Sequence, residues 1–268
     1  MATLVTFHAH PDDAEISCGG IMAQAKADGH RVVLVIATRG ELGEQRPGIV
    51  QDGETLSDRR VAETLAGAEI LSVDRVEFLG YRDSGMAGEP TNDDAGSFAS
   101  ADLDEAANRL ARLVEEERAD VLTVYDDHGG YGHPDHIQVH RVGVRAAEIA
   151  SVAGYDGPTV YEGTINRDYL KRLMLAHPEA MAEIEDAERP DELDSLGVPE
   201  ALITTTVDVR EYARLKRKAL AAHASQIGPE SFFLALPDDA FVESFGYEWF
   251  IRRGAPAGTR EATLFGNG

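Results

Sequence analysis

Hydrophobic and polar positions follow two kinds of pattern in the first half of the chain. Short, β-branched apolar runs predict buried strands at Thr3–Phe7, Arg31–Thr38, Arg75–Leu79 and Val121–Tyr125. Apolar residues at helical spacing predict helices between them, at Glu15–Asp28, Ser57–Leu71 and Leu103–Glu117, with Ser57 and Asp102 as N-caps. Strands that alternate with helices predict an α/β fold with right-handed crossovers and a doubly wound, mostly parallel, Rossmann-like sheet.

The remainder of the chain predicts a smaller, mixed segment. Its expected elements are a helix from His136 to about Val152, a strand Thr159–Gly163, a helix Tyr169–Ala187, a polar segment Glu188–Pro199, a strand Leu202–Val209, a helix Glu211–Ala224, a loop Ile227–Asp239 and a strand Phe245–Arg252. A chain of 268 residues is close to the size at which single cores stop growing. We therefore expect residues 1–155 to form a catalytic core and residues 156–268 to complete the same domain as a substrate-binding wall.

Composition narrows the classes of function. The 48 acidic and 25 basic residues give a net charge of −23, which repels phosphate backbones, so we expect no nucleic-acid partner. No apolar run reaches the ~18 residues of a membrane span, and the N-terminus lacks the features of a signal peptide, so we expect a cytoplasmic protein. Cys18 is the single cysteine, which excludes an intrachain disulfide and a multi-cysteine metal cage.

The first and fourth predicted strands both end in clusters of imidazoles and carboxylates. Residues 8–15 read His-Ala-His-Pro-Asp-Asp-Ala-Glu, and residues 126–136 read Asp-Asp-His-Gly-Gly-Tyr-Gly-His-Pro-Asp-His. A His-Pro-Asp triplet is thus present twice, each time between a strand and a helix. Ligands of doubly wound sheets bind at the carboxyl ends of the strands, so we expect the functional site here. The long connections 39–56 and 80–101 are candidate walls of its cleft.

The spacing of these side chains suits a catalytic metal ion. A catalytic zinc takes three protein ligands and leaves one position for water. His10 and Asp13 lie three residues apart at a turn into a helix, and His136 offers a third donor from the second cluster. The ion would lower the pKa of its water and polarise the scissile carbonyl. Asp12 then remains as a carboxylate beside that water and is the candidate general base.

The second triplet supplies the other half of the predicted chemistry. The imidazole of His133 would protonate the leaving amine or stabilise an oxyanion, and Asp135 would hold that imidazole. One His-Pro-Asp triplet indicates little, because Asp and Pro are common where helices begin, but two at equivalent places predict catalytic metal binding. His8, at the end of the first strand, is expected to be a packed or hydrogen-bonded residue.

These motifs resemble those of the LmbE-like (PIG-L) family of zinc-dependent N-acetylglucosaminyl deacetylases and, around residues 82–92 and 126–136, those of its mycothiol-pathway deacetylase and amidase members. Residues 9–15 and 129–136 carry the similarity, with weaker support from residues 60–63, 82–86 and 222–226. The resemblance covers most of the chain. Beyond about Tyr155, however, the chain departs from the mycothiol enzymes in a shorter, very acidic tail.

The resemblance implies that His10, Asp13 and His136 bind the metal ion, which is Zn²⁺ with Fe²⁺ as an alternative. It further implies that Asp12 is the general base and that His133 is the acid that also stabilises the oxyanion. It also implies that Tyr131 swings over the site and polarises the amide carbonyl, and that Arg60, Asp83 and Gln226 bind hydroxyl groups of the sugar or its aglycone. The implied substrate is a small N-acetylated amino sugar conjugate, which loses acetate. From the residues alone, Arg60 could instead pair with Glu63 within a helix, and Asp83 could be a turn residue.

Other functions remain open from the sequence. An amidase that acts on a bulkier N-acyl or thiol conjugate would use the same chemistry. A sugar- or metal-binding homologue would have lost catalytic activity. Two histidines and a carboxylate also match the iron(II) facial triad of oxygenases. A dinucleotide-binding protein is disfavoured, because the first strand-to-helix turn has no glycine-rich phosphate loop. The sequence specifies neither the aglycone nor the oligomeric state, and a homo-oligomer stays open.

Overall fold

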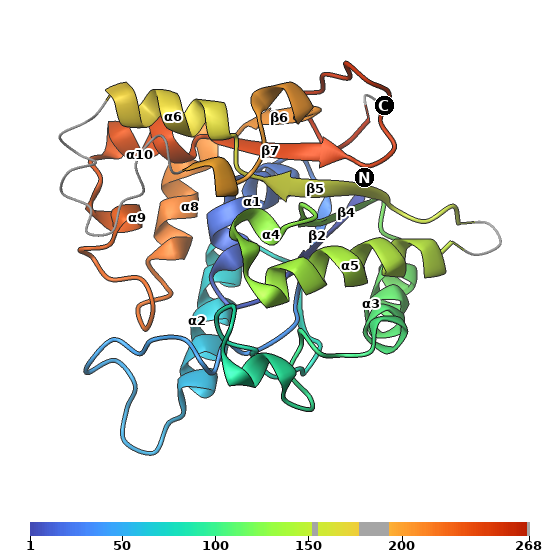
Figure 1. Cartoon of the computed structure of the whole chain (residues 1–268). Helices are drawn as coiled ribbons and strands as arrows, with labels where there is room; N and C mark the ends of the chain where they lie inside the picture. Colours follow the sequence, from blue (N-terminus) through green and yellow to red (C-terminus); the bar gives the residue numbers. More distant parts are fainter. Residues whose placement is uncertain (152–154, 177–192, 267–268) are drawn as a thin grey trace.

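The computed structural model describes residues 1–151, 155–176 and 193–266. Within these residues the chain builds a seven-stranded sheet with the order β3-β2-β1-β4-β5-β7-β6. The strands are β1 (Thr3–His8), β2 (Arg31–Ile36), β3 (Arg75–Phe78), β4 (Val121–Tyr125), β5 (Thr159–Thr164), β6 (Thr205–Asp208) and β7 (Tyr247–Arg252). Strands β1 to β5 pair in parallel, and β7 runs antiparallel to both β5 and β6. The predicted doubly wound, mostly parallel α/β fold is confirmed (Figure 1).

Helices cover both faces of this sheet (Figure 1). They are α1 (Asp13–Ala27), α2 (Leu56–Ile70), α3 (Leu103–Glu117), α4 (Gly129–Gly132), α5 (Pro134–Ile149), α6 (Arg167–Ala176), α8 (Ala213–Leu220), α9 (Phe232–Ala235) and α10 (Asp238–Phe245), with 3₁₀ turns η1 (Pro90–Asp93), η2 (Leu193–Ser195), η3 (Glu200–Leu202) and η4 (Arg210–Tyr212). On one face, α3 and α5 pack on Val5 and Phe7 of β1. On the other face, α1 packs on Leu4, and its Cys18 is buried in this second core.

The position of α5 matters for the site, because the second His-Pro-Asp triplet lies at its start. The central strand β1 is apolar on both faces, as is typical of strands covered by helices on both sides, and Leu4, Val5 and Phe7 are fully buried. Gly143 lets α5 approach β4 closely, since a Cβ at this position would lie 2.2 Å from Cγ1 of Val124. This close packing fixes the start of α5 at the carboxyl edge of the sheet.

The loops that follow β1 and β4 meet at a switch point of the chain. From β1 the chain continues to β2 and β3 on one side, and it later returns to place β4 and β5 on the other side. The two His-Pro-Asp triplets therefore follow neighbouring parallel strands, at their carboxyl ends. Such switch points are where doubly wound sheets bind ligands, so the fold brings together the two clusters that the sequence singled out.

Some observed bounds differ from the predicted ones. The bounds of α3 and β4 are as predicted, but α2 begins at Leu56 because Thr55, and not Ser57, is its N-cap. The Thr55 hydroxyl accepts the Asp58 amide at 3.1 Å, and the Asp58 carboxylate accepts the Thr55 amide. This reciprocal capping box places the N-cap of the helix two residues earlier than the prediction.

The largest differences lie near the C-terminus. Residues 227–239, predicted as a loop, contain α9 and the start of α10. These helices are too short for a periodic pattern, and α10 is fixed by the buried side chain of Phe241. Both β6 and α8 are shorter than predicted, because η3 and η4 form turns beside them. The remainder of the predicted helix 169–187 and residues 188–192 of the predicted polar segment lie outside the described residues.

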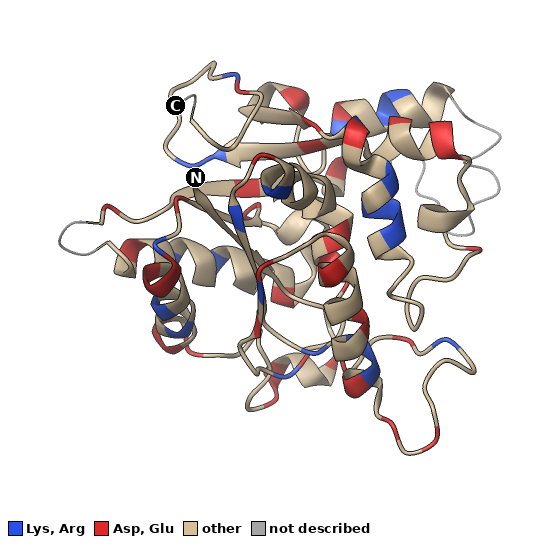
Figure 2. Ribbon diagram, turned by 180° about the vertical axis from the view of Figure 1, so that it is seen from behind, with Lys and Arg blue, Asp and Glu red and all other residues tan. Residues whose placement is uncertain are grey.

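The acidic residues are distributed over helices and loops throughout the ribbon (Figure 2). Arginine and lysine are interspersed with them, and several are paired with acids, such as Lys26 with Asp74 and Arg31 with Glu117. Among the described residues, no helix is both long enough and apolar enough to cross a membrane.

Candidate active site

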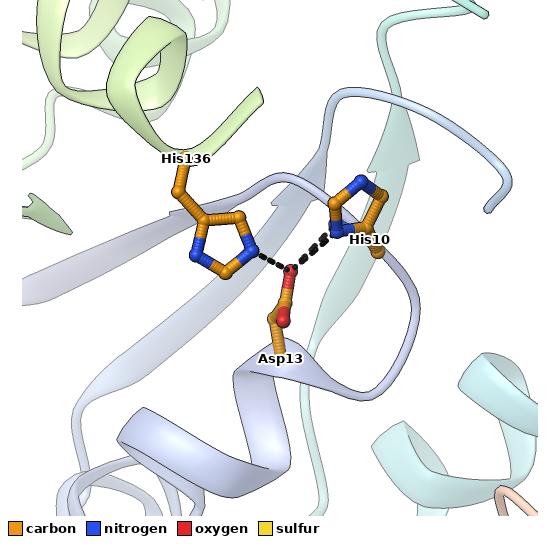
Figure 3. Close-up of side chains that lie close together, drawn as sticks. All are labelled: His10, Asp13 and His136. Atoms are coloured by element: carbon orange, nitrogen blue, oxygen red, sulfur yellow. Dashed lines mark hydrogen bonds and ion pairs between the residues drawn. The ribbon is translucent and has the colours of Figure 1, made fainter. Parts of the chain in front are cut away.

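Two histidines converge on one carboxylate where the loops after β1 and β4 meet (Figure 3). Nδ1 of His10 lies 3.2 Å from Oδ2 of Asp13, and Nε2 of His136 lies 3.3 Å from the same oxygen. Donor atoms of all three residues lie within 4.8 Å of one another. Both histidines are buried, and Asp13 is partly buried. The three residues proposed as metal ligands from the sequence therefore occupy one small volume.

The local fold holds each of these side chains. Asp13 begins α1, and its Oδ2 also accepts the main-chain amide of His10 at 2.8 Å. His136 lies in the first turn of α5, which starts with Pro134. Gly129 has a φ of +70°, and a Cβ there would lie 2.7 Å from Cβ of His136. Glycine is required at this position, because it lets the preceding loop pass next to the histidine.

The trio of His10, Asp13 and His136 fits a divalent metal ion such as zinc. Histidine nitrogen and carboxylate oxygen are zinc donors, and tetrahedral bonds of ~2.1 Å place donor atoms about 3.4 Å apart. The observed separations of 3.2 and 3.3 Å are close to that value. Nε2 of His136 is buried and has no hydrogen-bond partner among the described residues, which is the state of a donor that is available to an ion.

The charges within the trio are strongly coupled. Burial would raise the pKa of Asp13, but the charges of His136 and His10, with the hydrogen bond of His10, hold it well below its usual range. Burial would lower the pKa of His10, but hydrogen bonds with Asp13, Asp135 and Asp83 raise it well above its usual value. The three carboxylates thus form an environment that favours a cation, either a proton on His10 or a metal ion.

Asp12 combines an unusual backbone with a paired carboxylate. Its φ of +100° is rare for a residue other than glycine, and such backbone conformations concentrate at functional sites. Oδ1 of Asp12 accepts a hydrogen bond from Arg60 at 2.9 Å, and the same guanidinium donates to the carbonyl of Gly40. Burial raises the pKa of Asp12, Arg60 opposes this rise, and Asp13 adds to it. The turn therefore places a carboxylate with a raised pKa directly beside Asp13.

His133 caps α5 and lies beside the trio. Its Nδ1 accepts the main-chain amide of Asp135 at 3.1 Å, and its ring centroid lies 4.7 Å from that of His10. Burial, together with the positive charges of His10 and His136, lowers the pKa of His133 to about 4. Since Nδ1 is an acceptor, the neutral ring carries its proton on Nε2, which is then the donor atom of this side chain.

The carboxylate of Asp135 does not hold His133 as the sequence predicted. Its Oδ2 lies 3.2 Å from Nε2 of His10, and its two oxygens accept hydrogen bonds from the amide and the hydroxyl of Ser84. Asp135 meets the His133 ring through its main-chain amide, and its charge raises the pKa of that ring. A fully buried carboxylate requires donors, and Ser84 and His10 provide them.

Tyr131 lies at the entrance of the site. It belongs to the short helix α4, and the three glycines around it all have positive φ angles, which only glycine adopts readily. Its ring centroid lies 4.9 Å from that of His136, and the side chain is 48% exposed. Burial and the charge of Asp13 raise the pKa of Tyr131, so the hydroxyl stays protonated and can donate a hydrogen bond.

Two of the three residues implied in substrate binding lie on connections around the site. Asp83 follows β3, and its Oδ1 lies 3.5 Å from Nε2 of His10. The charge and hydrogen bond of His10, with two main-chain amides, hold the pKa of Asp83 well below its usual range against the effect of burial. Gln226 follows α8, and its amide donates to the carbonyl of Glu44 in the connection between β2 and α2.

Arg60, the third of these residues, is buried and paired with Asp12. The alternative pairing of Arg60 with Glu63 is wrong. Glu63 accepts hydrogen bonds from the amide and hydroxyl of Ser225, at 2.9 and 2.6 Å.

The structure adds residues that the sequence did not assign to the site. The ring of Tyr125 stacks on His136 at 4.3 Å between centroids, and its hydroxyl lies 3.0 Å from Nδ1 of His8. His8 is thus the hydrogen-bonded histidine that its place at a strand end indicated. Ser84 lies within one of the weaker motifs, but its contact with Asp135 spans 51 residues of sequence, and no local signal reveals it.

Comparison with known proteins agrees with the motifs. Residues 5–147 match the family described as GlcNAc-PI de-N-acetylase, PIG-L. The chain is 39% identical to a 1D-myo-inositol 2-acetamido-2-deoxy-alpha-D-glucopyranoside deacetylase of Thermomonospora curvata, over 96% of this chain and 94% of that relative. The alignment therefore continues beyond Tyr155, where the sequence indicated a departure.

Solved structures share the fold at low sequence identity. The N,N'-diacetylchitobiose deacetylase of Pyrococcus horikoshii gives a TM-score of 0.61 at 17% identity, over 92% of this chain and 82% of that chain. The 4-carboxy-2-hydroxymuconate hydratase of Pseudomonas putida KT2440 gives 0.61 at 19%, over 96% and 98%. Because a deacetylase and a hydratase share it, the fold alone does not define the reaction. The matched motifs and the near full-length identity do define the family, and the chain belongs to the PIG-L, or LmbE-like, family.

Proposed function

We propose that the protein is a metal-dependent deacetylase that hydrolyses the acetamide of an N-acetylglucosamine α-linked to 1D-myo-inositol. The observation that carries the proposal is the convergence of His10 and His136 on Asp13, with Asp12 and His133 beside them. The names of the near full-length relatives support this choice of substrate. The amide C–N bond breaks, a C–O bond to water forms, and the products are acetate and a free amine.

His10, Asp13 and His136 would hold the ion, which we propose to be Zn²⁺, with Fe²⁺ as an alternative on the same donors. When bound, such an ion supplies Lewis-acid chemistry, which activates water and polarises the acetamide carbonyl. The low pKa of Asp13 supports its role, because a metal ligand must stay deprotonated.

Asp12 acts in this proposal as the general base. It accepts a proton from the attacking water, and its pairing with Arg60 keeps the carboxylate directed at the site. The raised pKa of Asp12 supports this role, because a base must hold the proton that it has taken.

His133 and Tyr131 act on the other side of the acetamide. Nε2–H of His133 donates a hydrogen bond to the carbonyl oxygen of the acetamide, while Nδ1 is held by the amide of Asp135. The proton that Asp12 has taken from water passes to the leaving amine, which regenerates the base. The Tyr131 hydroxyl donates a hydrogen bond to the carbonyl oxygen as negative charge develops there. The glycines around Tyr131 give its loop the freedom to bring the hydroxyl over a bound substrate.

Arg60, Asp83 and Gln226 would contact hydroxyl groups of the sugar and the inositol. Asp83 is nearest to the trio, and its carboxylate is also held by the amides of Gly85 and Leu42. Carboxylates fixed in this way are rigid acceptors for sugar hydroxyls. We propose that Asp83 binds hydroxyl groups of the glucosamine ring. Gln226, which follows α8, would bind hydroxyl groups of the inositol.

The test is metal content and acetate release on the same purified protein. We expect about one divalent ion per chain, loss of activity on chelation, and recovery when Zn²⁺ or Fe²⁺ is added. Among acetylated, longer-acyl and thiol-conjugated substrates, the N-acetylglucosaminyl inositol should be turned over fastest. Full activity in metal-free protein would refute the metal role, and preference for a bulky acyl group would show an amidase instead.

A further inference from the structure

We propose that Ser84 and Asp135 position the metal ligand His10, with Asp135 orienting its ring and Ser84 anchoring Asp135. The inference rests on the metal site of the proposed function. It assigns the Asp135 carboxylate to the metal ligand His10 in place of His133. It also adds Ser84, a residue to which neither the motifs nor the comparisons assign a role.

Every contact of the Asp135 carboxylate supports this assignment. Asp135 is fully buried, and a buried carboxylate is costly unless donors surround it. Oδ1 accepts the hydroxyl of Ser84, and Oδ2 accepts the amide of the same residue at 3.0 Å. Oδ2 also lies 3.2 Å from Nε2 of His10. The serine thus fixes both oxygens and directs one of them at the histidine.

This contact determines which nitrogen of His10 is free for the ion. If Nε2 carries the hydrogen and donates it to Asp135, then Nδ1 keeps its lone pair, and Nδ1 is the atom that faces Asp13 at 3.2 Å. Histidine ligands generally donate their other ring N–H to a carboxylate or carbonyl, which fixes the ring and makes it a stronger ligand.

Asp83 is the competing acceptor for the same N–H. Its Oδ1 lies farther from Nε2 of His10, at 3.5 Å. The two oxygens of Asp83 are also used by the amides of Gly85 and Leu42. Asp135 is therefore the closer and better directed partner, and Asp83 remains available to a substrate.

Ser84 is itself held in place by the connection between β3 and α3. The residue is fully buried, its hydroxyl accepts the amide of Ala99 at 2.9 Å, and its carbonyl accepts the side chains of Thr91 and Asn92. Because the Ala99 amide points at the hydroxyl oxygen, the hydroxyl hydrogen is directed at Asp135. The connection between β3 and α3 is thereby linked, through Ser84 and Asp135, to the metal ligand His10.

The experiment measures Zn²⁺ affinity of the metal-free full-length protein by competition with a chromophoric chelator. Asp135→Asn should weaken Zn²⁺ binding ~10–100-fold, the usual effect of losing such an outer partner, and Ser84→Ala about tenfold. Ser97→Ala is the matched control, because Ser97 is a buried serine of the same connection whose hydroxyl bonds to Asn92 and Ser100. It should leave the affinity unchanged.

A double variant separates positioning from general destabilisation. Because Ser84 acts through Asp135, Ser84→Ala combined with Asp135→Asn should bind Zn²⁺ no more weakly than Asp135→Asn alone. Circular dichroism of the metal-free proteins checks that each is folded. Equal affinities of the Ser84→Ala and Ser97→Ala proteins would overturn the inference, as would an Asp135→Asn protein that loses rate but keeps its affinity. If the unsubstituted protein itself bound no Zn²⁺, the metal site of the proposed function would fail, and the inference with it.

Discussion

Asp12 and Asp13 are adjacent in the sequence, yet their carboxylates lie in opposite electrostatic surroundings. Asp13 lies between two imidazoles that hold its pKa well below the usual range despite burial. Burial raises the pKa of Asp12, and its ion-pair partner is Arg60. A metal ligand must remain deprotonated, whereas a general base must gain a proton during the reaction. The surroundings therefore suit Asp13 to the metal and Asp12 to the water.

We predict that substitution of these two residues separates metal binding from catalysis. Asp13→Ala removes one of three donors, so metal content and deacetylation rate should fall together. Asp12→Asn should keep near-normal metal content while the rate falls ~10²–10⁴-fold, the usual contribution of a positioned base. The measurements are metal stoichiometry and steady-state rate on both proteins. An Asp12→Asn protein without metal, or with its full rate, would show that the roles are assigned wrongly.

Residue types and spacing predicted which side chains meet at this site, because both motifs follow neighbouring strands of a parallel sheet. They did not predict the direction of each side chain. Asp135 is two residues from His133, so the sequence favoured contact between their side chains. In the fold, the Asp135 carboxylate points instead to Ser84 and His10, which are 51 and 125 residues away. Contacts over such separations depend on the packing of elements and leave no mark in local spacing.

At the scale of elements, α2 shows how one cap defines a helix that serves the site. The helix carries Arg60, the partner of Asp12, one turn after its start. Thr55 and Asp58 form a capping box, in which each side chain accepts the main-chain amide of the other. Ser57 lies inside the helix, although its residue type also suits an N-cap.

We predict that Thr55→Ala lowers the free energy of unfolding by about 0.5–2 kcal/mol, the usual cost of losing a threonine or serine N-cap. Ser57→Ala is the matched control and should have little effect, because alanine is favourable within a helix. The measurement is chemical denaturation followed by circular dichroism. The opposite order of the two effects would show that Ser57 is the cap in solution.

Elements with strong patterns could be predicted closely, and short helices could not. The periodic apolar face of α3 and the fully buried apolar run of β4 predicted the bounds that the structure shows for these two elements. Helices α9 and α10 have only four and eight residues, too few for a helical period to stand out, and they depend on contacts among distant aromatic residues such as Phe232 and Phe245. Their formation is a property of the packed C-terminal segment.

At the scale of the whole molecule, a buried ion pair ties the end of the chain to its beginning. Nζ of Lys216 on α8 lies 2.8 Å from Oε1 of Glu248 on β7, and both side chains are buried. The two carboxylate oxygens of Glu248 also accept the amides of Gly20 and Ile21 in the middle of α1, each at 2.8 Å. A Cβ at Gly20 would lie 2.9 Å from Oε1 of Glu248, so glycine permits this approach. These contacts join residues 1–155 to residues 156–268.

We predict that Lys216→Met destabilises the entire protein, because it leaves the Glu248 carboxylate buried without its cation. Removal of one partner from a buried ion pair typically costs about 3–5 kcal/mol. Lys171→Met is the matched control, since Lys171 pairs with an exposed carboxylate, that of Asp194, and should change stability little. Unfolding should be followed by the fluorescence of Trp249, the single tryptophan, which reports on β7, and by circular dichroism, which reports on all helices. If the two segments form one cooperative domain, both probes give the same midpoint, and both midpoints fall together in Lys216→Met. A tryptophan transition that shifts while the circular dichroism transition stays in place would instead show that residues 156–268 unfold as a separate unit.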